Sequence, residues 1–296
     1  MPFQPKIASI NKKKQQITEV KTFGSTFTVP AGVTKMLVTV IGGGGGGGGA
    51  YVNLKTSSPF GTLQMRGSGA SGAGGSSASR YFAAVPGVVC TYSIGGGGSG
   101  GVVSNPGVTI SGIGGAGGNS TFTYPGQSAL AISGGGGGNS TQHRQNSSLG
   151  GVTITGVAGS VSGSSSGSAN IAPSWQLKGG NGLTGVRLVE ISSASHTGNA
   201  AGSAAGTLNP GATPTGTASV DGGALYGGRG ASGMTVSGVS PSGGFAANGF
   251  TPGGQIGGGG SGGAVNLRTF GTFEGTRSAT GGPGNPGAVI ITYWKR

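Results

Sequence analysis

The side chains that could perform acid–base or nucleophilic chemistry are few in this sequence. The carboxylates and histidines are Glu19, Glu190, Asp221, Glu274, His143 and His196. No pair of carboxylates has a spacing that indicates a general acid with a general base. A serine nucleophile needs a histidine positioned beside it, and the many serines leave no Ser–His pair to choose. We therefore expect no enzyme, no catalytic residue, no cofactor and no metal site.

Two further patterns also carry no chemistry. The pattern Gly-x-Gly-x-x-Gly recurs, but a phosphate cradle needs a strand before it and a helix after it. No segment sustains an apolar period of 3.6 residues, so we expect almost no helix. The single cysteine, Cys90, cannot form an internal disulfide and is expected to serve as a small apolar strand residue.

Charge gives a clue to partners. The formal net charge is +13, and residues 1–21 supply +4 of it from five lysines and one glutamate, which leaves +9 for the rest. A basic protein favours anionic partners. The arginines are scattered, and Gly-Gly-Arg-Gly occurs once, at 227–230, so we expect no nucleic acid. No stretch of about 18 apolar residues exists, so we expect no membrane insertion.

Composition restricts the fold more strongly than charge does. Glycine supplies 74 of 296 residues, against about 7% in average proteins. Collagen is excluded because its strict Gly-X-Y repeat is missing. Disorder is disfavoured because hydrophobic residues make up 33% and several segments alternate as strands do. We therefore expect an ordered core in which backbone packs on backbone.

Glycine also recurs at every third position, in addition to the unbroken run 42–49. Examples are Gly69, Gly72 and Gly75; Gly112, Gly115 and Gly118; and Gly281, Gly284 and Gly287. An extended helix with three residues per turn makes no internal hydrogen bonds, so its peptide groups can bond to neighbouring helices. Only glycine allows the close approach of the axes. The interruptions Ile113, Ala116, Arg229 and Pro283 fall off this register. The core glycines that we select are Gly45, Gly98, Gly115, Gly136, Gly182, Gly230, Gly259 and Gly284.

Conventional strands flank the glycine segments. The β-rich segments 25–29 and 33–41 surround a proline–glycine turn, and 79–85 and 88–94 surround a second one, so each pair is predicted to be a hairpin. The closing segment 288–294 is predicted to share a sheet with the first strands. Trp294 is then expected to anchor that sheet. The base strands are thus placed near 25–41, 80–94 and 288–294.

Several of these segments match a known family. Residues 27–33, 38–49, 92–98, 117–122, 131–138 and 287–291 follow the order seen in phage glycine-rich tail proteins. The plan of the whole chain resembles the detachable adhesins of T-even-type phages. That resemblance implies a mostly irregular and β fold: a polyglycine II helix sandwich on a β-strand base, with variable segments that bind the host receptor.

We divide the chain into a basic N-terminal arm, 1–21, and one glycine-rich body, 22–296. The arm is either a solvated tail or a peptide that attaches the protein to another virion component. It is shorter than the N-terminal region of the adhesins that the chain resembles, which leaves the mode of attachment open.

Segments that run between a base and a far end must alternate in direction. Counting these reversals of direction along the chain places 51–66, 102–111, 141–178 and 264–280 at the far end. The path between 186 and 252 stays unassigned. Aromatic and arginine side chains among small polar residues make good binding anchors. The predicted receptor-binding residues are Tyr51, Phe60, Arg66, His143, Arg144, Trp175, Arg268, Phe270, Phe273 and Arg277. The alternative is that the aromatic residues pack the loops onto each other.

The resemblance and the composition lead to one functional expectation. The chain is expected at the tip of a phage tail fibre, held by a tail-fibre or other virion protein through its arm and base. Its predicted receptor is an outer-membrane protein or lipopolysaccharide of the host. A structural virion protein, such as a head fibre or decoration protein, is the alternative. Long irregular segments argue against an ice-binding protein, which would have a regular flat face.

Overall fold

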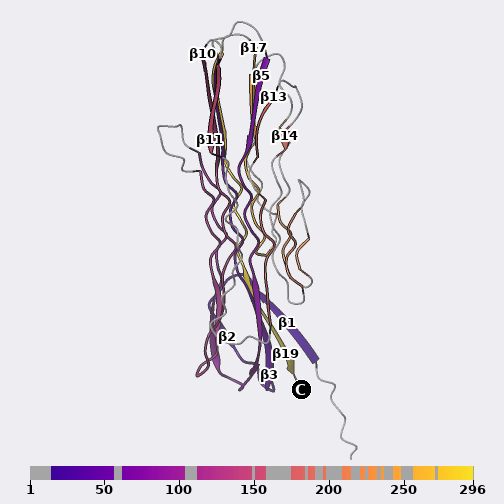
Figure 1. Ribbon diagram of the computed structural model, residues 1–296. Coiled ribbons are helices and arrows are strands. Elements are labelled where there is room, and N and C mark those ends of the chain that lie inside the picture. Colours follow the sequence, from indigo (N-terminus) through magenta and orange to yellow (C-terminus); the bar gives the residue numbers. More distant parts are fainter. Residues whose placement is uncertain are drawn as a thin grey trace, which may run out of the picture.

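The protein is elongated, with a β-rich base, a glycine-rich middle and a β-rich far end (Figure 1). The computed structural model describes residues 15–56, 62–103, 112–148, 151–157, 175–183, 186–190, 196–197, 209–214, 221–223, 226–231, 235–236, 243–247, 256–270 and 273–295. In these ranges the chain forms strands β1 to β19 and no α-helix. The expected fold class, mostly β and irregular with almost no helix, is confirmed.

Two sheets face each other in the base. The first has five strands in the order β1 (Gln15–Lys21), β19 (Ala288–Lys295), β3 (Lys35–Ile41), β6 (Ser77–Ala83) and β12 (Trp175–Leu177). The second has the order β2 (Thr26–Thr28), β7 (Val89–Ser93), β8 (Ser120–Thr123) and β9 (Leu130–Ile132). As predicted, the closing strand β19 pairs with the early strand β3.

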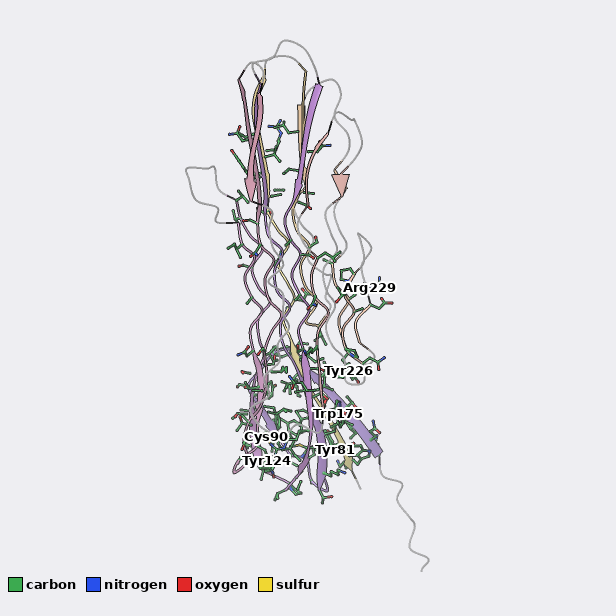
Figure 2. The ribbon with its side chains drawn as sticks, in the orientation of Figure 1. Tyr81, Cys90, Tyr124, Trp175, Tyr226 and Arg229 are labelled. Carbon is green, nitrogen blue, oxygen red and sulfur yellow. The ribbon has the colours of Figure 1, made fainter. Side chains whose placement is uncertain are left out.

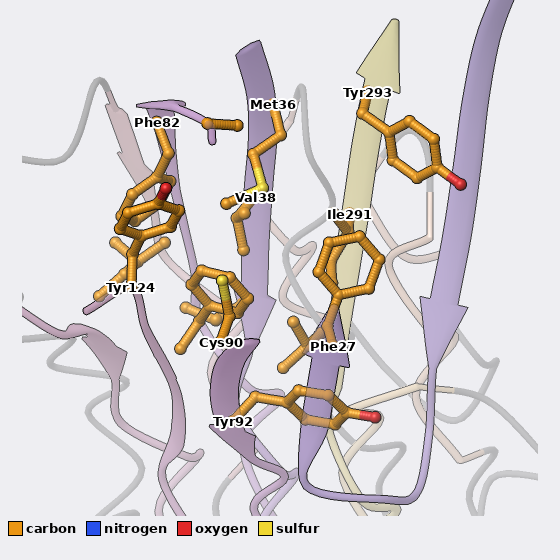
Figure 3. Close-up of a cluster of buried hydrophobic side chains, with 14 of the residues drawn as sticks. Phe27, Met36, Val38, Phe82, Cys90, Tyr92, Tyr124, Ile291 and Tyr293 are labelled. Atoms are coloured by element: carbon orange, nitrogen blue, oxygen red, sulfur yellow. The ribbon is translucent and has the colours of Figure 1, made fainter. Parts of the chain in front are cut away.

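Alternate residues of these strands meet in one apolar core between the two sheets (Figure 3). Phe82 of β6 lies edge-on to Phe122 of β8, with ring centroids 5.4 Å apart. Cys90 is fully buried in this core, and burial raises the pKa of its thiol to about 11. The thiol therefore stays protonated and packs as a small apolar group, as the sequence predicted.

The two predicted hairpins are wrong. Strand β2 pairs with β7 and not with β3, and β6 pairs with β3 and not with β7. Each proline–glycine turn instead carries the chain from one sheet to the facing one, with Gly32 and Gly87 at positive φ. The apolar residues on both sides of each turn enter the same core from opposite sheets. The two strands of a hairpin would instead lie side by side in one sheet and would not face each other across a core.

One glycine segment, 42–49, forms the axis of the middle region, and every residue in it is buried. Consecutive amides point in three directions: Gly45 donates to Ala73, Gly46 to Gly115 and Gly47 to Gly282, at 2.8–2.9 Å. Three residues earlier, the amides of Gly42, Gly43 and Gly44 donate to the same three neighbouring segments. This period of three is that of the extended helix predicted from the glycine spacing. We call 42–49 the central rod.

Six further rods surround the central rod. Rods 69–76, 112–119 and 280–287 run towards the base and accept hydrogen bonds from it. Rods 95–101, 134–140 and 257–263 run with it, away from the base, and donate hydrogen bonds to it. The two groups alternate around the axis, and each rod of the first group donates to both of its neighbours in the second group. The result is a closed hexagonal ring around the central rod. The expectation named only a sandwich of helices and not this arrangement.

Contact between rods explains the glycine requirement. A Cβ on Gly45 would overlap the carbonyl oxygen of Gly136, and one on Gly46 would overlap that of Ser99. The third-position glycines of the outer rods meet the same obstacle: a Cβ on Gly72 would overlap the carbonyl oxygen of Gly45. Added methyl groups would also collide at the predicted core positions Gly98, Gly115, Gly182, Gly259 and Gly284. Gly136 accepts a bond from Ala73, and Gly230 is buried.

Some side chains of the outer rods face away from the bundle. Ile113, Ala116 and Asn119 are exposed at intervals of three along one outer rod, and Pro283 and Pro286 along another. The interruptions therefore mark the solvent side of the bundle, as their position off the glycine register predicted. Arg229 is likewise exposed, and its guanidinium donates to the carboxylate of Asp221.

The base sheet begins earlier than the predicted domain boundary after residue 21. Residues 15–21 form β1, which pairs antiparallel with β19 along its whole length. Residues 1–14 lie outside the described ranges, so the role of the arm in attachment stays a prediction.

We expect Gly45→Ala to destabilise the protein severely, because the new methyl group would force two backbones of the hexagonal ring apart. Overpacking of this kind costs about 1–3 kcal/mol or more. Gly96→Ala is the matched control, since Gly96 is exposed and a Cβ there meets nothing within 4 Å. That control should unfold at or slightly above the wild-type temperature. Thermal unfolding checks both variants, and equal midpoints for the two would contradict the backbone-packed core.

A second prediction concerns pH. Glu19 on β1 accepts hydrogen bonds from Tyr293 Oη at 2.7 Å and from Lys21 Nζ at 2.6 Å. Burial opposes its ionisation, yet these two partners hold the pKa of Glu19 below its ordinary value of 4.5. The ionised carboxylate therefore stabilises the fold above pH 4.5, and this contribution is lost as the pH falls through the lower folded value.

Glu19→Gln should therefore lower the free energy of unfolding at pH 7 by up to about 1 kcal/mol. The difference from wild type should shrink as the pH falls through the lowered pKa of Glu19. Thermal unfolding of both proteins between pH 7 and pH 3 measures this, and a difference that does not change with pH would refute the assigned role of Glu19.

Candidate functional site

The far end consists of two facing four-stranded sheets. One has the order β11 (Gly151–Val157), β10 (Thr141–Ser148), β4 (Ala50–Thr56) and β18 (Phe273–Ala279). The other has the order β13 (Val186–Glu190), β5 (Thr62–Ser68), β17 (Ala264–Phe270) and β16 (Gly243–Ala247). A small apolar cluster from β4, β17 and β18 joins the sheets near the rods. The predicted irregular loops are thus largely paired strands.

Strand ends of both sheets lie at the tip. In one sheet β4 ends at Thr56 and β18 begins at Phe273, and in the other β5 begins at Thr62 and β17 ends at Phe270. Phe270 is paired with Thr62, and Phe273 is paired with Thr56. Each pairing therefore brings two strand ends together at the tip. Phe60 lies outside the described residues.

The predicted basic residues are distributed over both sheets. In one sheet, His143 is paired with Val52, and Arg144 with Asn53. In the other, Arg66 is paired with Asn266, and Arg268 with Gln64. The strand pairings thus place these four basic residues at one end of the molecule, although they come from segments far apart in the sequence.

Arg277 is the predicted basic residue at the far end whose side-chain contacts are described. It stands on the edge strand β18, opposite Val52, and its guanidinium is exposed. Its Nη1 donates to the carbonyl oxygen of Thr276 at 2.8 Å. Arg277 therefore places a positive charge on an exposed edge of the far end.

Tyr51 and Trp175 do not match the predicted contact surface. Tyr51 is 2% exposed within β4, so its ring packs inside the far end. Trp175 lies in the base, where β12 pairs with β6 and its ring stands 6.1 Å from that of Tyr81 (Figure 2). The prediction failed because the segment 141–178 was treated as one far loop, whereas β12 already belongs to the base sheet.

The path between 186 and 252, which the sequence left unassigned, is partly described. Strand β13 joins the far end, and β16 pairs with β17. Strand β14 (His196–Thr197) pairs with β15 (Thr235–Val236). Residues 226–231 lie beside the rod 257–263: Ala231 donates a hydrogen bond to Gly259 of that rod, and Gly228 donates one to Ile256, the residue directly before it. Sequence reasoning missed β13, although the apolar and β-branched residues of 186–190 are a signal for a strand.

Comparison with known proteins supports the glycine-rich architecture. The profile of a family described as a glycine-rich domain matches residues 18–294. The chain belongs to this glycine-rich domain family. A separate search of curated proteins found no match. The matched range, 18–294, covers both the base and the far end.

Two properties of the described ranges bear on the chemistry. They contain no helix that is long and apolar enough to span a membrane. They also bring no three histidine, cysteine or acidic side chains together as a metal site. What the far end does offer is several basic residues on paired strands.

The different positions of Trp175 and Arg277 lead to a prediction about binding. If the far end contacts the target, Arg277→Ala should weaken binding by about tenfold, the loss expected for an interface residue worth about 1.4 kcal/mol. Trp175→Ala should leave binding unchanged, because the base lies at the other end. Binding of the purified variants to host cells measures both effects, and a larger loss for Trp175→Ala would show that the base is the contact surface.

Proposed function

We propose that this protein is a bacteriophage tail-fibre adhesin that recognises the host surface through its far end. The observation that carries the proposal is the arrangement of the two ends: a rigid bundle of rods separates two β-rich regions, one of which holds the basic strands. Binding residues are commonly placed at the edge of such a rigid scaffold.

The chain ends favour the base as the attached side. Strand β1 begins at Gln15, which is paired with Lys295, so the first and last described residues lie together at the base (Figure 1). A connection to the fibre there leaves the far end free to meet a cell. The resemblance to phage tail adhesins agrees with this orientation.

The bundle accounts for the rigidity that a tip protein needs. Hydrogen bonds link the central rod to six neighbours along its whole length. A force on the far end is therefore carried by many backbone bonds in parallel. The far-end strands continue directly from the rods, as β4 does from the central rod and β17 from 257–263.

The charge of the far end indicates an anionic target. Arg66, Arg144, Arg268 and Arg277 lie on its strands, and the acidic Glu274 is paired with Lys55. Electrostatic attraction of this kind steers association with a surface of opposite sign. Lipopolysaccharide phosphates and acidic loops of an outer-membrane protein both fit this chemistry.

A competition experiment tests the proposal. Purified protein, added to host cells before the phage, should block adsorption in proportion to the number of cell sites that it occupies. Gly45→Ala protein, which should be severely destabilised, is the negative control. Failure of the folded wild-type protein to compete at saturation, combined with binding to capsids, would favour the decoration role.

A further inference from the structure

The base has one long open sheet edge. Strand β1 is the outermost strand of the five-stranded sheet and runs for seven residues. The other outermost strands of the base, β12, β2 and β9, have three residues each. Short edge strands protect a sheet from pairing with other chains. Among the described strands of the base, β1 alone lacks this protection.

The charges on β1 do not close that edge. Charged side chains that point inward from an edge strand usually discourage pairing, because pairing would bury them. Glu19 and Lys21 lie on the inward side, but they form an ion pair of 2.6 Å, and Glu19 also accepts the hydroxyl of Tyr293. An added strand would therefore cover a neutral, hydrogen-bonded group and not an unpaired charge.

A second and independent feature stands at the end of the same edge. Phe23 follows β1 directly and is 85% exposed, the highest value among the large apolar side chains of the described residues. Its carbonyl oxygen accepts a hydrogen bond from Tyr92 Oη at 3.1 Å, which fixes the backbone. Val20 of β1 is also 40% exposed. An exposed aromatic ring on a backbone that is held in place can serve as an interface anchor.

We propose that β1 receives an extended strand of the virion protein that carries this chain, with Phe23 inserted into an apolar pocket of that partner. The inference rests on the proposed function and names the mode of attachment. Main-chain hydrogen bonds to the open edge would supply affinity, and Phe23 with Val20 would supply specificity, as in other complexes formed by strand addition. The position of β1 at the base keeps the partner away from the far end.

Phage particles assembled without this chain are the probe. Labelled wild-type protein should sediment with them. Phe23→Ser and Val20→Lys should each weaken that binding by about tenfold or more, because the first removes the anchor and the second places a lysine at the open edge. Ile113→Ser is the matched control, since Ile113 is 58% exposed on an outer rod. Its binding should stay within about twofold of wild type, and all three variants should keep the wild-type unfolding temperature.

Hydrogen exchange separates strand addition from other contacts. Amides of residues 15–21 should become more protected when the protein is bound to particles. Unchanged exchange there, or wild-type binding by both variants, overturns the inference, while adsorption blocking by the same protein would leave the proposed function intact. Wild-type protein that neither binds particles nor blocks adsorption overturns both. A dimer of the free protein that Phe23→Ser abolishes would assign the edge to a second copy and also overturn the inference.

Discussion

The hydrogen bonding of a buried main chain is the constraint on which this structure depends. Each residue of the central rod is shielded from water, so its amide and carbonyl must find protein partners. A helix with three residues per turn directs these groups to neighbours on all sides, and six rods of alternating direction accept or donate in turn. This arrangement leaves no room for a Cβ at the contacts, which is why an interior of this size contains so little side-chain volume.

The two β-rich ends follow from that constraint. Polyglycine rods bury few apolar side chains, among them Ala70 and Ala73, so they lack most of the hydrophobic contribution that offsets the entropy of ordering glycine. The base supplies it through a core in which Phe82, Phe122 and Met36 are almost fully buried. It also holds the ends of the rods in register, since β3, β6 and β19 continue directly into them. The bundle in turn separates the ends, so that attachment and recognition can be assigned to different surfaces.

The candidate site was only partly predictable. Arg66, Arg144, Arg268 and Arg277 were placed at the far end because each rod must reverse the direction of the one before it. Tyr51 was placed there too, but its burial depends on packing between sheets, which sequence spacing does not report. Trp175 was misplaced because nothing in its neighbourhood marks the return of the chain to the base. Phe60 and the connection 271–272 lie outside the described residues, so their contribution to binding stays a prediction.

The sequence by itself determined the extended threefold rods, because glycine at every third position is a local pattern that fits one backbone geometry. It also determined the near absence of helix and the pairing region of the closing strand. Only the tertiary structure decided how the rods are arranged around 42–49 and which strands pair across the base. Both proline–glycine turns read locally as hairpins, yet each joins facing sheets, because burial of apolar side chains from both strands in one core outweighs pairing between neighbours in sequence.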